Sequence, residues 1–176
     1  EGIAVQEPGA FTSKVLARLL DDLVLVTESQ MESALALLVQ IEKTVVEGAG
    51  AAGLAAVMAY PELFKGRKVG IVLTGGNIDT RLLANVLLRD LARSGRLARL
   101  RLTLQDRPGA LFKVMRVFDQ HSVNIIEIYH QRIFTHLPAK GLTADIECEA
   151  RDREQLDALV ASLRAKGYVV DQVELG

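Results

Sequence analysis

The chain has 176 residues with a formal net charge of −1, and 49% of its residues are hydrophobic. This length allows one or two small domains with an apolar core, and the near-zero charge argues against a nucleic acid as the main partner. One cysteine, Cys148, excludes an internal disulfide and is typical of a reducing compartment. The longest apolar stretches are too short for a bilayer and no secretory leader is recognisable, so we expect a cytoplasmic protein without membrane partners.

The first half of the chain has the pattern of an α/β protein. Asp22–Val26 and Lys68–Leu73 are short and apolar, which predicts buried strands without strict alternation. Between them, Thr27 and Gln30 form a capping-box pattern at the start of an amphipathic helix. We therefore predict a parallel sheet that is covered by helices on both faces.

Two further helices are predicted in this half. One follows a small-residue segment and ends before Pro61. The other begins after Asp79 or Thr80, either of which can cap it, and carries an apolar face that includes Leu83 and Val86. The predicted order is strand, helix, helix, strand, turn and helix.

Two small-residue segments in this half are candidate sites. Leu73-Thr-Gly-Gly-Asn77 is either a plain strand-to-helix turn or, at the carboxyl end of a parallel strand, part of a ligand crevice. Glycines there allow a flat ligand to approach the backbone, and Thr74 has a hydroxyl that can bond a heterocyclic nitrogen. Glu47-Gly-Ala-Gly-Ala51 is explained by close helix packing, except that the carboxylate of Glu47 needs a partner or solvent.

The pattern changes after Ser94-Gly95, where alternation of apolar and polar residues begins. It predicts a βαββαβ arrangement, the split-βαβ plan. The predicted elements are a strand with Leu100, Leu102 and Leu104, a helix with Leu111, Val114, Met115 and Phe118, a strand at Val123–His130, a strand at Leu142–Ala150, a helix with Leu156, Leu159, Val160 and Leu163, and a strand at Tyr168–Leu175.

Charge matching supports this topology. The split-βαβ plan places the first strand beside the third, so that Arg99 and Arg101 would face the acidic residues at alternate positions from Asp145 to Glu149. Each such cross-strand pair contributes about 0.2–1 kcal/mol.

A third candidate site is Asp106-Arg-Pro-Gly-Ala-Leu111. The segment is either a helix start, with Asp106 as its cap and Pro108 near the first turn, or a site for a small anionic or zwitterionic ligand on free helix-terminal amides. The residues alone leave both interpretations open. The three histidines, His121, His130 and His136, lack metal-ligand spacing, so we expect no metal site, and His121 is predicted at a helix end.

Taken together, three stretches resemble the threonine and serine dehydratases of fold type II, the pyridoxal-phosphate class typified by tryptophan synthase β. They are Glu1-Gly-Ile-Ala-Val-x-x-Pro-Gly9, Glu47-Gly-Ala-Gly50 and Leu73-Thr-Gly-Gly-Asn-Ile-Asp79, and the similarity covers residues 1 to about 93. The resemblance implies that Thr74 hydrogen-bonds the pyridine nitrogen of the cofactor. It further implies that Glu47 lies near the cofactor ring and that Gly75 and Gly76 line the same wall.

Residues 97–176 resemble an ACT regulatory domain. The resemblance implies an amino-acid effector, by analogy isoleucine or valine, bound at the first strand-to-helix turn and at the start of the second strand. The implied effector residues are Asp106, Arg107, Pro108, Gly109, Ala110, Leu111, Asn124 and Ile125. Because ACT ligands usually bind where two copies pair, an oligomer is implied as well.

We therefore expect residues 1–94 to be the carboxyl-terminal part of a catalytic domain and residues 95–176 to be an ACT domain. The expected activity is dehydration of L-threonine to 2-oxobutanoate and ammonia, a step of isoleucine biosynthesis. The Ser-x-Lys motif that supplies the Schiff-base lysine of this family is absent from these residues. The chain alone should thus be inactive, should expose apolar surface, and should need a companion amino-terminal segment or another copy.

Three alternatives remain at this point. Serine dehydration and amino-acid racemisation occur on the same scaffold, and the substrate loop that separates them is not in these residues. A third alternative is a non-catalytic amino-acid sensor in which the ACT domain acts alone.

Overall fold

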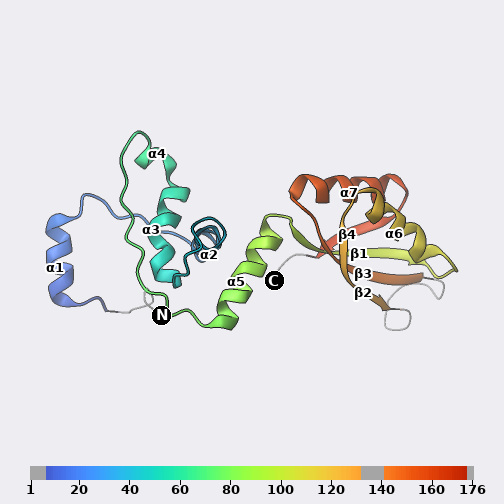
Figure 1. The fold of residues 1–176 in the computed structure, drawn as a ribbon, viewed down its shortest axis with the longest axis horizontal. Helices are drawn as coiled ribbons and strands as arrows, with labels where there is room; N and C mark the ends of the chain where they lie inside the picture. Colours follow the sequence, from blue (N-terminus) through green and yellow to red (C-terminus); the bar gives the residue numbers. More distant parts are fainter. Residues whose placement is uncertain (1–6, 132–140, 174–176) are drawn as a thin grey trace. The chain divides into compact units, whose positions relative to one another are not determined.

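The computed structural model describes residues 7–131 and 141–173. The chain divides into two compact units, which we call the amino-terminal unit (Glu1–Asp90) and the carboxyl-terminal unit (Leu91–Gly176). Figure 1 labels the elements of both. His136 and the first residues of the Glu1–Gly9 motif lie outside the described residues.

The amino-terminal unit is built mainly from helices. They are α1 (Ala10–Leu19), α2 (Glu28–Leu37), the π-helix η1 (Leu38–Glu42), α3 (Gly48–Ala59), α4 (Pro61–Phe64) and the start of α5 (Thr80–Arg93). The capping box predicted at α2 is confirmed, because the Thr27 side chain accepts from the Gln30 N–H and the Gln30 side chain accepts from the Thr27 N–H. Asp79 caps α5 as predicted, accepting from the Leu82 N–H at 3.0 Å.

The predicted strands of this unit are not formed. Residues 22–26 and 68–73 run without a strand ladder, although both belong to extended connections between helices. A parallel strand is defined by hydrogen bonds to its neighbours, and the described residues of this unit supply no neighbouring strand for either segment. A side chain fixes the first of these connections instead, because the Tyr60 hydroxyl donates to the Leu25 carbonyl at 2.7 Å.

The amino-terminal unit exposes apolar surface, as expected from the sequence. Phe11 is 82% exposed, Val72 79% and Leu25 77%. Its buried cluster is small and lies mainly on α2 and α3, with one ion pair at its margin between Glu32 and Arg89. Exposure of this extent is typical of a surface that another polypeptide covers.

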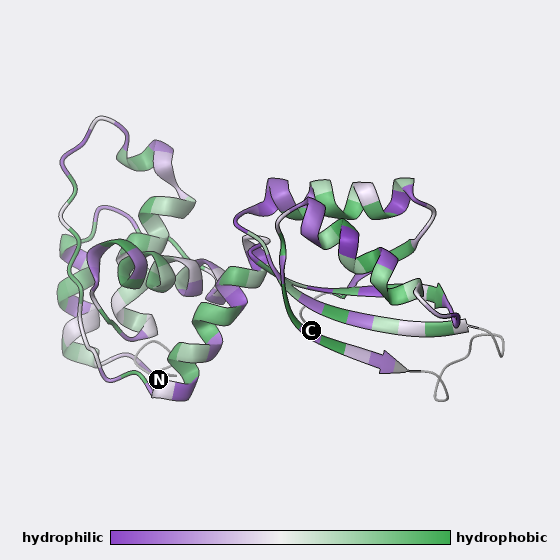
Figure 2. Cartoon of the chain, turned by 45° about the vertical axis from the view of Figure 1, so that its right-hand side comes forward, coloured by the Kyte–Doolittle hydropathy of each residue, from purple (hydrophilic) through white to green (hydrophobic). Residues whose placement is uncertain are grey.

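The carboxyl-terminal unit has the predicted βαββαβ order. It consists of β1 (Leu97–Gln105), α6 (Ala110–Gln120), β2 (Asn124–Gln131), β3 (Gly141–Glu149), α7 (Arg153–Ala165) and β4 (Val169–Val173). The antiparallel sheet has the strand order β2-β3-β1-β4, and both helices lie on one of its faces (Figure 1). The alternation of polar and apolar residues is visible along the strands in Figure 2.

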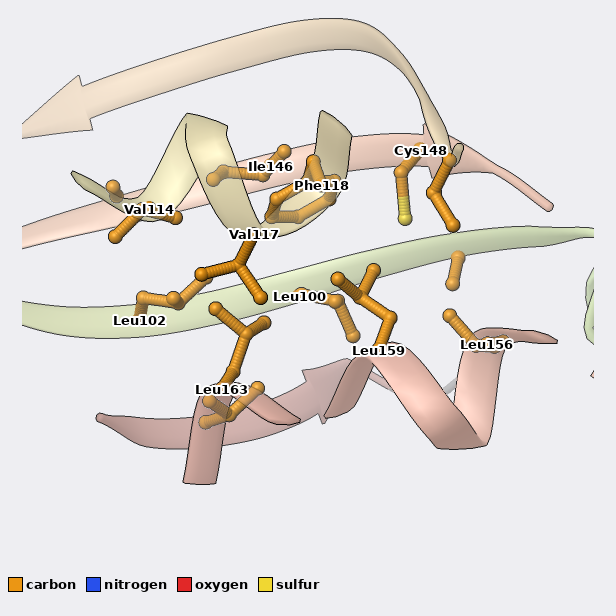
Figure 3. Close-up of a cluster of buried hydrophobic side chains, with 14 of the residues drawn as sticks. Leu100, Leu102, Val114, Val117, Phe118, Ile146, Cys148, Leu156, Leu159 and Leu163 are labelled. Atoms are coloured by element: carbon orange, nitrogen blue, oxygen red, sulfur yellow. The ribbon is translucent and has the colours of Figure 1, made fainter. Parts of the chain in front are cut away.

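The core of this unit lies between the sheet and its two helices. Figure 3 shows Phe118 of α6 and Leu159 of α7 pointing toward the sheet, where Leu100 and Ile146 meet them. All four side chains are at most 1% exposed. Cys148 lies in the same core, and burial raises the pKa of its thiol to about 12, so that the sulfur is a neutral packing group.

The open face of the sheet carries the predicted charge ladder. Arg99 lies opposite Glu147 and bonds it, and Arg101 makes a two-pronged pair with Asp145 at 2.8 and 2.7 Å. The Arg99 guanidinium also lies 5.6 Å from the centre of the Tyr129 ring. The predicted pairing of the first and third strands is therefore confirmed in register.

This ladder predicts a pH-dependent stability. The Arg101 hydrogen bond holds the pKa of Asp145 below its ordinary value of 3.8, although burial acts in the opposite direction. A carboxyl whose pKa is depressed by folding stabilises the fold above its unfolded pKa, and that contribution disappears as the pH falls through the folded pKa. We expect Asp145→Asn to cost about 1 kcal/mol at neutral pH and almost nothing at an acidic pH below the folded pKa of Asp145.

Urea unfolding of the chain at both pH values measures this effect. Glu149→Gln is the matched control, because Glu149 is an exposed carboxylate at the end of the same strand. An Asp145→Asn cost that stays constant down to low pH would contradict the assignment.

Candidate functional site

The segment that leads into Thr74 packs directly against the small-residue face of α3. A side-chain carbon added at Gly53 would lie 2.9 Å from Cγ2 of Ile71, and one added at Gly50 would lie 2.0 Å from the Thr74 carbonyl oxygen. The two glycines are three residues apart and thus share one helix face. The sequence interpretation of close packing is confirmed, and the packed partner is the segment that leads into Thr74.

Glu47, directly before α3, continues this contact. Its backbone N–H donates to the Gly75 carbonyl at 2.9 Å, and its carboxylate lies over Gly75. A side-chain carbon at Gly75 would approach Cδ and Oε1 of Glu47 to 2.5 Å, and Gly75 has a φ of +65°, which other residues rarely adopt. Gly76 lies beside the Val45 carbonyl, where an added carbon would come to 3.4 Å.

We call Glu47, Gly50, Thr74, Gly75 and Gly76 the Glu47–Gly75 cluster. The structure thus brings together all four residues that the sequence predicted at the cofactor, Glu47, Thr74, Gly75 and Gly76. Gly50 was not singled out, although its small size was noted as part of the packing segment. Its proximity to the Thr74 carbonyl shows that it positions the turn, and only the fold reveals that role.

The cluster is compatible with a flat heterocyclic ligand. Thr74, Gly75 and Gly76 are exposed, and among the described residues none hydrogen-bonds the Thr74 hydroxyl. The position that a side-chain carbon of Gly75 would take is occupied by the Glu47 carboxylate, which therefore lies against the backbone of the turn. One small surface therefore carries the Thr74 hydroxyl, the glycine backbone at Gly75 and Gly76, and the Glu47 carboxylate.

The predicted effector residues lie at two ends of the carboxyl-terminal sheet. Asn124 pairs with Glu149, which pairs in turn with Leu97 at the start of β1. Asp106 follows Gln105 at the other end of β1, nine residues further along an extended strand. A strand of that length spans about 30 Å, so one copy does not bring Asn124 and Asp106 together.

The turn at Asp106–Gly109 differs in one detail from the helix-start interpretation. The N-cap of α6 is Gly109, with a φ of +79° and no side-chain cap, so the prediction of Asp106 as the cap is wrong. The reason is that the chain turns once more through Gly109 before the helix begins at Ala110. His121 is the C-cap residue of α6, in agreement with its predicted place at a helix end.

Two family models match different parts of the chain. Residues 1–75 match the family described as pyridoxal-phosphate dependent enzyme, and residues 98–165 match the ACT domain. The chain therefore combines part of a pyridoxal-phosphate-dependent enzyme with an ACT domain. Within that class, the chain is similar to L-threonine ammonia-lyases along nearly its whole length.

The chain is 34% identical over 170 residues to the L-threonine ammonia-lyase of Thermotoga maritima, which covers 97% of this chain and 42% of that protein. It is 36% identical over 171 residues to the L-threonine ammonia-lyase of Geobacter sulfurreducens, with the same coverage of 97% and 42%. The chain thus spans about two fifths of the length of these curated relatives. Among solved structures, the ACT domain of a Chlorobium tepidum GTP pyrophosphokinase matches 44% of this chain and 96% of that chain, with 20% identity and a TM-score of 0.36.

In the part of the chain that the structure describes, no helix is both long and apolar enough to cross a membrane.

Proposed function

We propose that the protein is a pyridoxal-phosphate-dependent threonine dehydratase, which converts L-threonine to 2-oxobutanoate and ammonia. The observation that carries the proposal is the Glu47–Gly75 cluster, in which an exposed threonine hydroxyl stands beside a bare glycine backbone. The two L-threonine ammonia-lyases are named for this reaction, and they match nearly the whole of this chain. We assign residues 1–94 to the catalytic domain and residues 95–176 to the regulatory domain.

The residues of the cluster have separate roles in this proposal. When bound, pyridoxal phosphate supplies a ring that withdraws electrons from the substrate carbon next to the amino group. Thr74 would hold the ring nitrogen through a neutral hydroxyl, a partner that suits elimination better than transamination. Gly75 and Gly76 would allow the ring to approach the backbone, and Glu47 would place a carboxylate nearby.

The carboxyl-terminal unit would bind an amino-acid effector, isoleucine or valine by analogy with ACT domains. The placement of its residues supports a site shared by two copies. β2 is an edge strand, and antiparallel pairing of two such edges would bring Asn124 of one copy toward the Asp106 end of the other. The amino-terminal unit, with its exposed apolar side chains, would pack against the rest of the catalytic domain.

The experiment compares two variants of Thr74 in the full-length protein. We expect Thr74→Ser to form 2-oxobutanoate from threonine at a rate near the parent's, because it keeps the hydroxyl. Thr74→Val keeps the shape and loses the hydroxyl, so we expect activity to fall at least tenfold, corresponding to the loss of about 1.4 kcal/mol of hydrogen bonding.

The same assay includes arms with serine as substrate and with isoleucine or valine added. The absorbance of the bound cofactor is recorded as a second readout. Turnover in the parent with equal activity in both Thr74 variants would contradict the assignment of the hydroxyl. No turnover of threonine with cofactor bound would overturn the reaction itself.

A further inference from the structure

A basic groove lies between α6 and the turn that joins α7 to β4. Its main hollow has a volume of about 380 Å³ and is bounded by the end of β1, the first turns of α6 and Lys166–Tyr168. A second hollow of about 300 Å³ continues along α6 and shares Lys113, Lys166 and Tyr168 with the first. We define the groove cations as Arg107, Lys113, Arg116 and Lys166.

Within residues 7–131 and 141–173, the groove cations form no ion pair with an acidic residue. No aspartate or glutamate of that part of the chain lines either hollow. Ion pairs described in this unit join Arg99 with Glu147, Arg101 with Asp145 and Arg151 with Asp152, and none of these pairs involves a groove cation. Each hollow is lined by three of these cations, which repel one another, so an anion placed between them relieves that repulsion.

The end of α7 does not neutralise the groove. A helix carboxyl terminus carries partial negative charge on its last carbonyls, which would otherwise attract the lysines. Here those carbonyls accept backbone N–H groups instead, with Lys166 bonding Ser162 at 3.2 Å, Gly167 bonding Arg164 at 2.9 Å and Tyr168 bonding Leu163 at 3.2 Å. The ammonium groups of Lys113 and Lys166 are thus left for a ligand.

We propose that this groove binds a small phosphate-bearing molecule. Lysine ammonium and arginine guanidinium groups are the side chains that bind phosphate oxygens most strongly, and the size of the groove falls within the range of small-molecule sites. An amino-acid effector fits it poorly, because its own ammonium group would face three cations in either hollow. The proposed phosphate site does not depend on effector binding, although its main hollow shares Arg107 and Ala110 with the proposed effector site.

The test is titration calorimetry of the full-length protein with inorganic phosphate and, separately, with a sugar phosphate, at constant ionic strength. The variant is Lys113→Gln/Lys166→Gln, which leaves Arg107 and the effector turn unchanged. The control is Lys65→Gln/Arg151→Gln, which removes the same charge from cations that sit in ion pairs at Glu62 and Asp152. We expect the variant to weaken phosphate binding by about tenfold or more and the control to leave it unchanged.

Binding of both compounds would identify the phosphate group as the recognised part, and binding of the sugar phosphate alone would add recognition of the sugar. Absence of saturable binding, or equal affinity in the parent and the groove variant, would overturn the proposal. Circular dichroism checks the fold of each variant. If the double variant fails to fold, Arg116→Gln provides the same comparison at a third, exposed groove cation.

Discussion

Replacing Phe118 with alanine is expected to destabilise the carboxyl-terminal unit by about 3–5 kcal/mol, the cost of removing a large buried aromatic side chain. Phe118 is 1% exposed and packs between α6 and the sheet (Figure 3). The neighbouring side chains belong to regular elements on both sides, so they can close the resulting cavity only in part. A loss of this size is a large share of the stability of a domain of about 85 residues.

The same helix provides the control. Phe112 is 65% exposed, so Phe112→Ala should change the free energy of unfolding by less than about 0.5 kcal/mol. Urea unfolding, followed by circular dichroism, measures both variants. Equal effects of the two substitutions would mean that the burial of α6 described here is wrong.

Replacing Gly75 with alanine should disrupt the Glu47–Gly75 cluster. The backbone at Gly75 has a φ of +65°, and an alanine there costs about 1–2 kcal/mol. The added methyl group would also lie 2.5 Å from the Glu47 carboxylate, which must move away from the turn. We expect the full-length protein to bind pyridoxal phosphate at least tenfold more weakly, because both the turn and its carboxylate are displaced.

Gly48→Ala is the matched control for this substitution. Gly48 is the first residue of α3, and an added carbon there meets nothing within 4 Å. It should leave cofactor binding unchanged and stabilise the helix slightly. Cofactor binding is read from the visible absorbance during titration, and unchanged affinity in Gly75→Ala would separate this turn from the cofactor site.

The predictability of the two units differs for a physical reason. Every strand of the carboxyl-terminal sheet pairs within the unit, so the alternation at Leu100–Leu104 and the charges at Arg101 and Asp145 determine register locally. The predicted strands at residues 22–26 and 68–73 have no neighbouring strand among the described residues of their own unit, so they are not formed. Apolar composition alone does not make a strand.

Other features were missed for different reasons. Helix α1 lay outside the predicted elements, although Phe11, Val15 and Leu19 follow a helical spacing in the sequence. The basic groove joins residues of α6 to Lys166, more than fifty positions along the chain, and only the fold brings them together. The same holds for Gly50 and Thr74, whose contact follows from the path of the extended segment over α3.

The separation of Asn124 from Asp106 would make regulation depend on the concentration of the protein in the cell. A ligand held by both residues would need two copies of the chain, so its binding would favour the paired state over separate subunits. The fraction of sites that the effector fills then depends on the concentration of the protein as well as on the concentration of the effector. Such a regulator would respond more sharply where the enzyme is abundant, and dilution alone would release the effector.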